Sequence, residues 1–306
     1  MTALVASWVL ILLTVVSVTF GHEVSAGLRE ARWNQERAQL EAYARAGVEF
    51  SRRYLEPQLR LAVVGQLEDT SASVEATRWA RDQLLRDVAV GEGHFTLGYL
   101  TQRNGKATTE YGLVDENRKV PLDLLDDATL RSLPGLTPAA VAILQEIRQS
   151  QREADDLTVD LSDLPGLDEA GRTTLRELVT SHASHVNINT ATAGSLTALG
   201  IPSAGAEKIV RYRNGADGEP FTSDDSLFTD LENPEGGLRE CRLDSGEAAA
   251  VSFLASAGYL DTRSDTFRIR SRGWTNPIGA FCEIETVVRF EGDGWEVRTW
   301  TQNWNG

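Results

Sequence analysis

The chain has 306 residues, a formal net charge of −15 and a hydrophobic fraction of 41%. This length is sufficient for one large or two ordinary domains, and the composition excludes an intrinsically disordered chain. The acidic balance argues against a nucleic-acid-binding protein, because phosphate contacts normally require a basic surface.

The N-terminal run from Thr2 to Phe20, TALVASWVLILLTVVSVTF, contains no charged residue. Its length is close to the roughly 20 apolar residues that a helix needs to cross a bilayer. The alternative is a cleaved signal peptide. However, no basic residue precedes the run, and residues 20–23 (FGHE) are a poor cleavage site. We therefore predict a retained transmembrane segment over residues 1–21.

The helix is predicted to continue as an amphipathic extension over residues 22–56. No proline occurs between Glu23 and Tyr54, and most residues in this range favour a helix. Apolar residues recur there at helical spacing: Leu40, Ala44, Gly47, Phe50 and Tyr54. The first helix breaker is Pro57, so we expect one helix of about fifty residues that ends there.

Residues 57–119 are expected to form the first part of an α+β head. Residues 58–90 have a helical pattern, with four candidate core positions: Trp79, Leu84, Leu85 and Val88. The period then changes to two, with Phe95, Leu97 and Tyr99 on one face. Asn104-Gly105 predicts a two-residue hairpin turn, and residues 109–113 predict the returning strand.

Residues 120–259 are predicted to be a helical block with internal repeats. Leu133-Pro134-Gly135-Leu136 recurs as residues 164–167, and a looser copy occupies residues 199–202. A short helix carrying apolar residues follows each copy. Each helical hairpin is too small to bury its own apolar face, so we expect the hairpins to pack against one another as a helix-hairpin-helix (SAM-like) domain.

Strands return over residues 260–306. TFRIR alternates, and FCEIETVVRF alternates with Glu283, Glu285 and Arg289 on the solvent side. A turn at Asp293-Gly294 leads into GWEVRTW. A helical block between two groups of strands indicates an insertion. The predicted fold is therefore α+β: a long N-terminal helix, one antiparallel sheet joining both strand groups, and an inserted all-α domain.

The helical hairpins resemble units that grip DNA, but they lack a key feature. DNA-binding hairpins place G-x-G at the turn, so that backbone N–H groups can approach a phosphate closely. Here Thr137, Asp168 and Pro202 stand near the position of the second glycine. Lys208, Arg211 and Arg213 leave the DNA-binding alternative open, although such a cluster is usually a solvated helix face. We expect no nucleic acid as a partner.

The order of these segments resembles the K family of minor pseudopilins from type II secretion systems. Three segments carry the resemblance: the N-terminal helix ALVASWVLILLTVVSVTF with REARWNQERAQLEAYARAGVEFSRRYL, the segment VNINTATAGSLTAL before the last hairpin, and the C-terminal strands. The resemblance spans nearly the whole chain.

The resemblance implies a structural, non-enzymatic subunit at the tip of a short periplasmic filament. Its partners would be other minor pseudopilins and the bacterial inner membrane, with a single-pass anchor and the head in the periplasm. The K member lacks the glutamate that other pseudopilins carry in the apolar run, and this run lacks it too. The family also begins with a basic leader cleaved after glycine. Here only Met1 and Thr2 precede the run, so processing stays open.

A calcium site is predicted in the turn-rich stretch 214–225, NGADGEPFTSDD. Its candidate ligands are Asp217, Glu219, Asp224 and Asp225, because Ca²⁺ prefers carboxylate and carbonyl oxygens. The spacing is not that of an EF-hand, and a solvated acidic loop is the alternative. The K family binds calcium in its inserted domain, so the resemblance implies the same ion.

Other features leave alternatives open. His182 and His185 have i,i+3 spacing but no third metal ligand, so a polar connector is favoured over a metal site. Cys241 and Cys282 are predicted either to pair or to remain buried thiols. No nucleophile elbow, P-loop or dinucleotide fingerprint is present. The two rival functions are a membrane-anchored DNA receptor of the competence type and a secreted enzyme.

Overall fold

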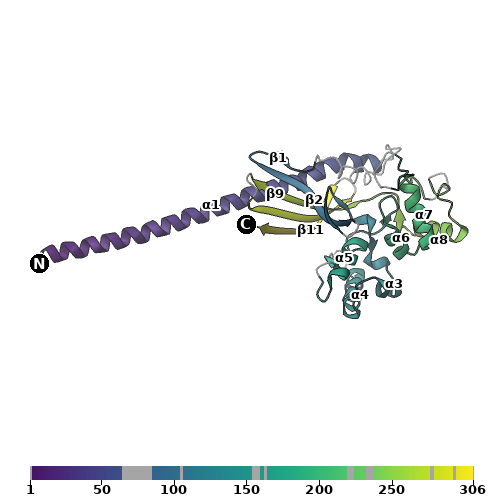
Figure 1. Cartoon of the computed structure of the whole chain (residues 1–306), viewed down its shortest axis with the longest axis horizontal. Coiled ribbons are helices and arrows are strands. Elements are labelled where there is room, and N and C mark those ends of the chain that lie inside the picture. Colours follow the sequence, from purple (N-terminus) through teal and green to yellow (C-terminus); the bar gives the residue numbers. More distant parts are fainter. Residues whose placement is uncertain are drawn as a thin grey trace.

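The computed structural model describes residues 2–63, 85–103, 106–153, 159–161, 164–218, 224–231, 237–275, 279–291 and 294–305. Figure 1 shows a long N-terminal helix that projects far beyond a head. Within the head, a sheet lies along the helix, and the shorter helices gather at the end away from the N-terminus.

The N-terminal helix α1 covers Thr2–Val63, so it is longer than predicted. The expected end at Pro57 is wrong: the helix passes the proline and forgoes the one backbone hydrogen bond that a proline cannot donate. Leu40, Ala44 and Val48 are buried against the head. Phe50, predicted in the same stripe, stays 38% exposed.

The strands from the two ends of the chain join in one seven-stranded antiparallel sheet, as predicted. Its main order is β1-β2-β9-β10-β11, with β3 on β2 and β4 on β9. The strands are β1 Val88–Val90, β2 Gly93–Arg103, β3 Lys106–Tyr111, β4 Val114–Asp115, β9 Thr266–Thr275, β10 Phe281–Glu291 and β11 Gly294–Asn305. The pairing of β2 with β9 brings residues far apart in the sequence together.

The predicted helix over residues 58–90 is wrong at its end. Residues 88–90 form strand β1, in which the β-branched Val88 and Val90 pair with Phe95 and Gly93. The candidate core positions Trp79 and Leu84 lie outside the described residues, as do both residues of the predicted turn at 104–105. Leu85 is buried, as expected.

Helix α1 lies close against one face of the sheet. A Cβ on Gly47 of the helix would lie 2.8 Å from Cδ2 of Phe95, which is too close for an unshifted contact. The apolar residues of this interface form one core cluster, which includes Leu97, Phe267, Ile269 and Ile284. The absence of a side chain at Gly47 therefore sets the distance between the helix and the sheet.

The segment between β4 and β9 contains short helices and two small parallel strand pairs. The elements are η2 Glu116–Arg118, β5 Val120–Pro121, η3 Leu122–Leu124, α3 Asp127–Ser132, α4 Pro138–Glu153, α5 Glu169–Leu178, β6 Val179–Thr180, β7 Val186–Asn187, α6 Ala193–Leu199, α7 Ser203–Arg213, α8 Ser245–Ser256 and β8 Leu260–Asp261. β5 pairs with β6, and β7 pairs with β8. These elements enclose a second core cluster.

The three sequence repeats have the same local geometry. Gly135, Gly166 and Gly200 all have positive φ, of 73°, 81° and 114°, a conformation that glycine adopts without strain. A helix follows each turn. The first turn packs directly on α5, because a Cβ on Gly171 would lie 2.5 Å from the carbonyl oxygen of Gly135. The assignment of this block to the helix-hairpin-helix family stays a prediction.

Both cysteines are buried and free in the structure. Cys241 belongs to the core of the helical block, and Cys282 belongs to the core between α1 and the sheet. Burial raises the pKa of the Cys241 thiol to about 12. Of the two alternatives left open by the sequence, the structure favours buried thiols.

Candidate functional sites: an apolar helix and a charged junction

The N-terminal half of α1 carries large apolar side chains that the described part of the chain leaves exposed. Their exposed fractions range from 44% to 68%. The residues are Trp8, Leu10, Leu12, Leu13, Val15, Val16, Val18, Phe20, Val24 and Leu28. Because consecutive positions point in all directions around a helix, this surface, the apolar sleeve, surrounds the helix. An apolar surface of this extent marks a site of contact with lipid or protein.

Residues 1–21, predicted to be a transmembrane segment, are helical from Thr2 onward. Among the residues that the structure describes, no helix combines enough length and hydropathy to qualify as a membrane crossing. The side chains of residues 1–6, 9 and 11, on which the prediction partly depends, lie outside that description.

A second site lies where the chain leaves the sheet for the helical block and returns to it. Asn117, just after β4, accepts hydrogen bonds from the backbone N–H groups of Asp265 and Thr266, at 3.1 and 3.0 Å. Its amide also donates to the carbonyl oxygen of His185 at 3.2 Å. One side chain therefore joins the outgoing chain, the returning chain and the helical block.

Asp115 makes a parallel set of contacts at the same place. Its carboxylate accepts hydrogen bonds from the hydroxyl groups of Thr190 and Ser264 and from the backbone N–H of Asn117. Burial raises the pKa of this carboxyl, and the three donors oppose that effect. Asp115 and Asn117 are both buried. The predicted insertion is thus held at both ends by buried polar side chains.

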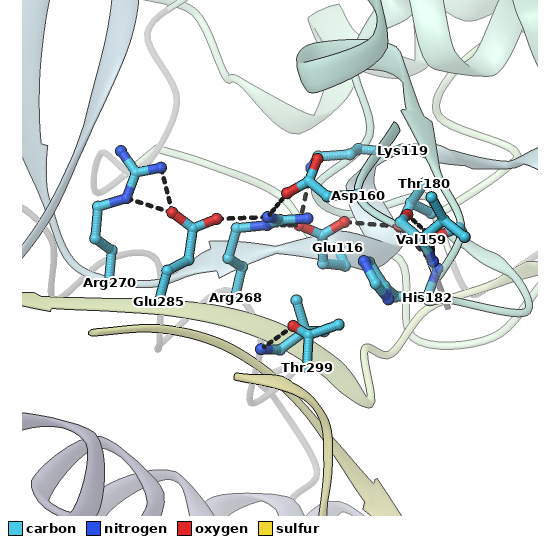
Figure 2. Close-up of polar contacts among 12 residues, drawn as sticks. Glu116, Lys119, Val159, Asp160, Thr180, His182, Arg268, Arg270, Glu285 and Thr299 are labelled. Atoms are coloured by element: carbon cyan, nitrogen blue, oxygen red, sulfur yellow. Dashed lines mark hydrogen bonds and ion pairs between the residues drawn. The ribbon is translucent and has the colours of Figure 1, made fainter. Parts of the chain in front are cut away.

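We call Asp115 and Asn117 the clamp. Next to the clamp is a network of charges, shown in Figure 2, which we call the charged junction. Its centre is Glu116, whose side chain is 0% exposed. The carboxylate accepts from Lys119 Nζ at 2.8 Å, Arg268 Nε at 2.7 Å and Thr180 Oγ1 at 2.7 Å. Arg268 reaches on to Asp160 at 2.9 Å, so the network joins the sheet to the helical block.

The junction continues across the face of the sheet opposite α1. Glu285 of β10 accepts hydrogen bonds from Arg268 and from Arg270, its direct partner on β9. Glu283 and Arg272 form the next such pair, at 2.8 Å. Glu283 and Glu285, which were predicted to lie on the solvent side of β10, are therefore half-buried members of a network of cross-strand ion pairs with β9.

Burial and charge act in opposite directions on the pKa values in this junction. Burial alone would raise the pKa of Glu116, but the nearby charges of Lys119 and Arg268 hold it well below its usual range. For His182, burial lowers the pKa from 6.5 to about 4, so the imidazole is neutral at physiological pH. The junction thus holds charged carboxylates beside an uncharged histidine.

Sequence reasoning missed the charged junction. Residues 115–119, DENRK, read as a solvated charge run, yet Glu116 and Lys119 are fully or almost fully buried. The one feature of the sequence that could have indicated their burial is their position between a strand and Val120, which is itself buried. His182, which was expected to belong to a polar connector, is 6% exposed. Within the described ranges, no group of three metal-ligating side chains is present.

The predicted calcium ligands are only partly described. Glu219 lies outside the described residues. Asp224 folds back on its own turn, and its Oδ2 accepts from the backbone N–H groups of Ala216 at 2.7 Å and Asp217 at 3.3 Å. The turn therefore brings Asp217 and Asp224 together, with Asp225 beside them in sequence. Calcium binding stays a prediction.

The basic residues after the third turn are largely engaged within the protein. Lys208 forms an ion pair with Glu247 of α8 at 2.6 Å. Arg213 is buried, and its Nη1 donates to the carbonyl oxygens of Ile188 and Ala191. Only Arg211 of the three is exposed. Of these three basic side chains, only that of Arg211 is therefore available to contact the phosphates of DNA.

No protein-family model matches the chain, and no curated protein matches it. Among solved structures, a chain from the crystal structure of the GspK-GspI-GspJ complex of the enterotoxigenic Escherichia coli type 2 secretion system is similar, with a TM-score of 0.49 and 12% identity. The similarity covers 90% of this chain and 99% of that chain.

Proposed function

We propose that this protein is a structural subunit of the minor pseudopilin type, of the K family, in a type II secretion system. In this proposal the apolar sleeve of α1 sits in the bacterial inner membrane. The head lies in the periplasm and contacts other minor pseudopilins at the tip of the filament, where it helps to start assembly. The subunit carries out no covalent chemistry.

The observation that carries the proposal is the division of α1 into two halves. The half that contains Leu40, Ala44 and Val48 packs on the sheet, whereas the apolar side chains from Trp8 to Leu28 are uncovered. Figure 1 shows that the N-terminal half of α1, which carries the uncovered side chains, extends away from the head. Burying such a surface in lipid or against neighbouring helices would be favourable by roughly 25 cal/mol for each Å² of apolar surface removed from water.

The membrane part is tested with charged substitutions in the apolar sleeve. An arginine in the middle of a spanning helix costs about 2.5–3.5 kcal/mol. The double variant Leu12→Arg with Val16→Arg should therefore move the full chain from the carbonate-resistant membrane fraction to the soluble fraction. The control, Arg32→Glu on the same helix, should remain with the membrane. If wild-type protein is extracted by carbonate, the anchor is wrong.

The pseudopilin part is tested by co-expression with the other minor pseudopilins of the same secretion system. We expect a complex of defined stoichiometry after gentle detergent extraction. We also expect secretion to fail when this chain is deleted and to recover when it is restored. A chain that stays in the membrane but forms no such complex, with secretion intact, would exclude the pseudopilin role while leaving the anchor valid.

A further inference from the structure

A cavity of about 410 Å³ lies where the charged face of the sheet meets the helical block. Arg268 and Glu285 line it from the sheet, and Arg118, Leu175 and His182 line it from the other elements. The volume is within the range of small-molecule sites. Nothing in the proposed filament role requires a cavity at this position, so its polar lining needs another explanation.

His182 supplies one unsatisfied group to this cavity. The residue is 6% exposed, and its ring Nδ1 has no hydrogen-bond partner in the described part of the chain. Its backbone N–H donates to Thr180 Oγ1 at 3.1 Å. A buried polar atom without a partner costs about 1–3 kcal/mol, and such atoms in folded proteins usually meet a ligand or an ordered water.

Arg118 supplies a second such group. Its Nε is buried and has no acceptor among the described residues, and no ion pair involves its guanidinium there. An arginine Nε–H can only donate a hydrogen bond, so the missing partner must be an acceptor. Three other cations of the cavity wall differ in this respect: Lys119 pairs with Glu116, Arg268 pairs with Glu116 and Glu285, and Arg270 pairs with Glu285.

We propose that this cavity binds a small oxyanion, either a phosphate or an organic carboxylate, through Arg118 and His182. An oxyanion offers only acceptors, and a planar guanidinium matches its geometry. A neutral imidazole with its proton on Nδ1 donates to the same group. Glu285 does not compete for Arg118, since Arg268 and Arg270 already hold it. The site is independent of the filament role.

The test uses the full chain in a nonionic detergent at low ionic strength, titrated with inorganic phosphate and, separately, with succinate. Calorimetry should show saturable binding of at least one of them, at one site. Arg118→Gln and His182→Phe should each weaken that affinity about tenfold or more, the usual effect of removing a hydrogen bond to a charged group. Arg131→Gln, which removes an exposed charge on α3 outside the cavity, should change nothing.

A second measurement separates contact from general charge effects. The chain has four histidines, so ¹⁵N signals of labelled imidazoles are few, and His182→Phe assigns one of them by its loss. That signal should shift on anion addition in wild type and in Arg131→Gln. If neither anion binds the wild-type chain, or if Arg118→Gln binds them as wild type does, the assignment is wrong. The cavity then holds only water.

Discussion

Gly273 of β9 lies directly under the carbonyl oxygen of Leu40 in α1, so that a Cβ on the glycine would be 2.6 Å from that oxygen. It would also lie 2.9 Å from the carbonyl carbon of Tyr43. Both neighbours are backbone atoms, which cannot rotate away as a side chain can. The helix therefore rests on the sheet at a point where only glycine fits, which fixes how the exposed half of α1 leaves the head.

Substitution of this glycine should loosen the helix. Gly273→Ala should lower the free energy of unfolding of the full chain by about 1–3 kcal/mol, because overpacking forces the backbone to move. Urea denaturation followed by tryptophan fluorescence measures the change. Gly294→Ala, at a position with no atom within 4 Å of the added Cβ, is the matched control and should stay within about 0.5 kcal/mol of wild type. Equal effects of the two would disprove the close-contact argument.

Breaking the charged junction should cost more than breaking a surface pair. Glu116→Gln would leave the buried charges of Lys119 and Arg268 without their carboxylate, which typically costs about 3–5 kcal/mol. Glu49→Gln removes the half-exposed partner of Arg52 on α1 and should cost only about 0.3–0.5 kcal/mol. Thermal unfolding of both variants compares the two. A Glu116→Gln variant as stable as Glu49→Gln would show that the junction contributes specificity without stability.

The parts of the fold that the sequence predicted are those governed by local period and turn chemistry. Alternation along β10 placed Cys282 and Ile284 in the core correctly, and the glycines of the three repeats adopt the turns expected of them. The end of α1 was predicted wrongly because a proline inside a long helix reads as a stop, whereas the helix continues past Pro57 to Val63. Local pattern does not distinguish a proline that ends a helix from one that the helix passes.

The charged junction could not be predicted for a different reason. Glu116 and Arg268 are 152 positions apart, and each lies in a segment whose charges look solvated when read alone. Their burial depends on β9 returning beside β4 after the whole helical block. The pattern along the sequence contains no information on that pairing. The clamp residues Asp115 and Asn117 lie in the same run of polar residues and were overlooked for the same reason.

The neutral state of His182 predicts a pH dependence of stability. Its folded-state pKa of about 4 is below the ordinary value of 6.5, so the unfolded chain binds the proton more readily. The stability associated with the neutral ring is fully present above pH 6.5 and falls as the pH drops from about 6.5 to 4. The expected loss is up to about 3 kcal/mol.

A substitution isolates this term from the carboxylates that also titrate in acid. The unfolding free energies of wild type and His182→Gln are measured at several pH values. As the pH falls from 6.5 to 4, wild type should lose more stability than the variant. Glu116, Lys119, Arg268 and Asp160 all act on the ring and remain in both proteins. A difference independent of pH would mean that the ring does not titrate in this window.

The rival function, a DNA receptor, predicts a measurable affinity of the chain for DNA. The contacts that Lys208 and Arg213 make within the protein argue against such an affinity. Since Lys208 and Arg213 are used internally, we expect no binding of labelled duplex or single-stranded DNA by the full chain at low salt. Fluorescence anisotropy measures this. Micromolar binding that weakens steeply with salt, and that is lost in Arg211→Glu, would overturn the expectation. Glu207→Gln on the same helix is the control for nonspecific charge effects.

Calcium should stabilise the turn that contains Asp217 and Asp224. The backbone N–H groups of Ala216 and Asp217 hold Oδ2 of Asp224, so the turn fixes this carboxylate beside Asp217, and carboxylate oxygens are the ligands that calcium prefers. At ten times its dissociation constant, a bound ion would raise the free energy of unfolding by about 1.4 kcal/mol. A calcium titration of the melting temperature, with magnesium as the comparison ion, measures this in the full chain.

The variant Asp224→Asn tests whether the ion uses this turn. It keeps one oxygen to accept the backbone N–H groups but removes the charge that calcium requires, so the calcium-dependent rise in melting temperature should disappear while stability without calcium changes little. Glu207→Gln removes an acidic side chain of α7 outside the turn and should keep the full rise. A rise that survives Asp224→Asn would place the ion elsewhere. No rise in wild type would leave residues 214–225 as a solvated acidic loop.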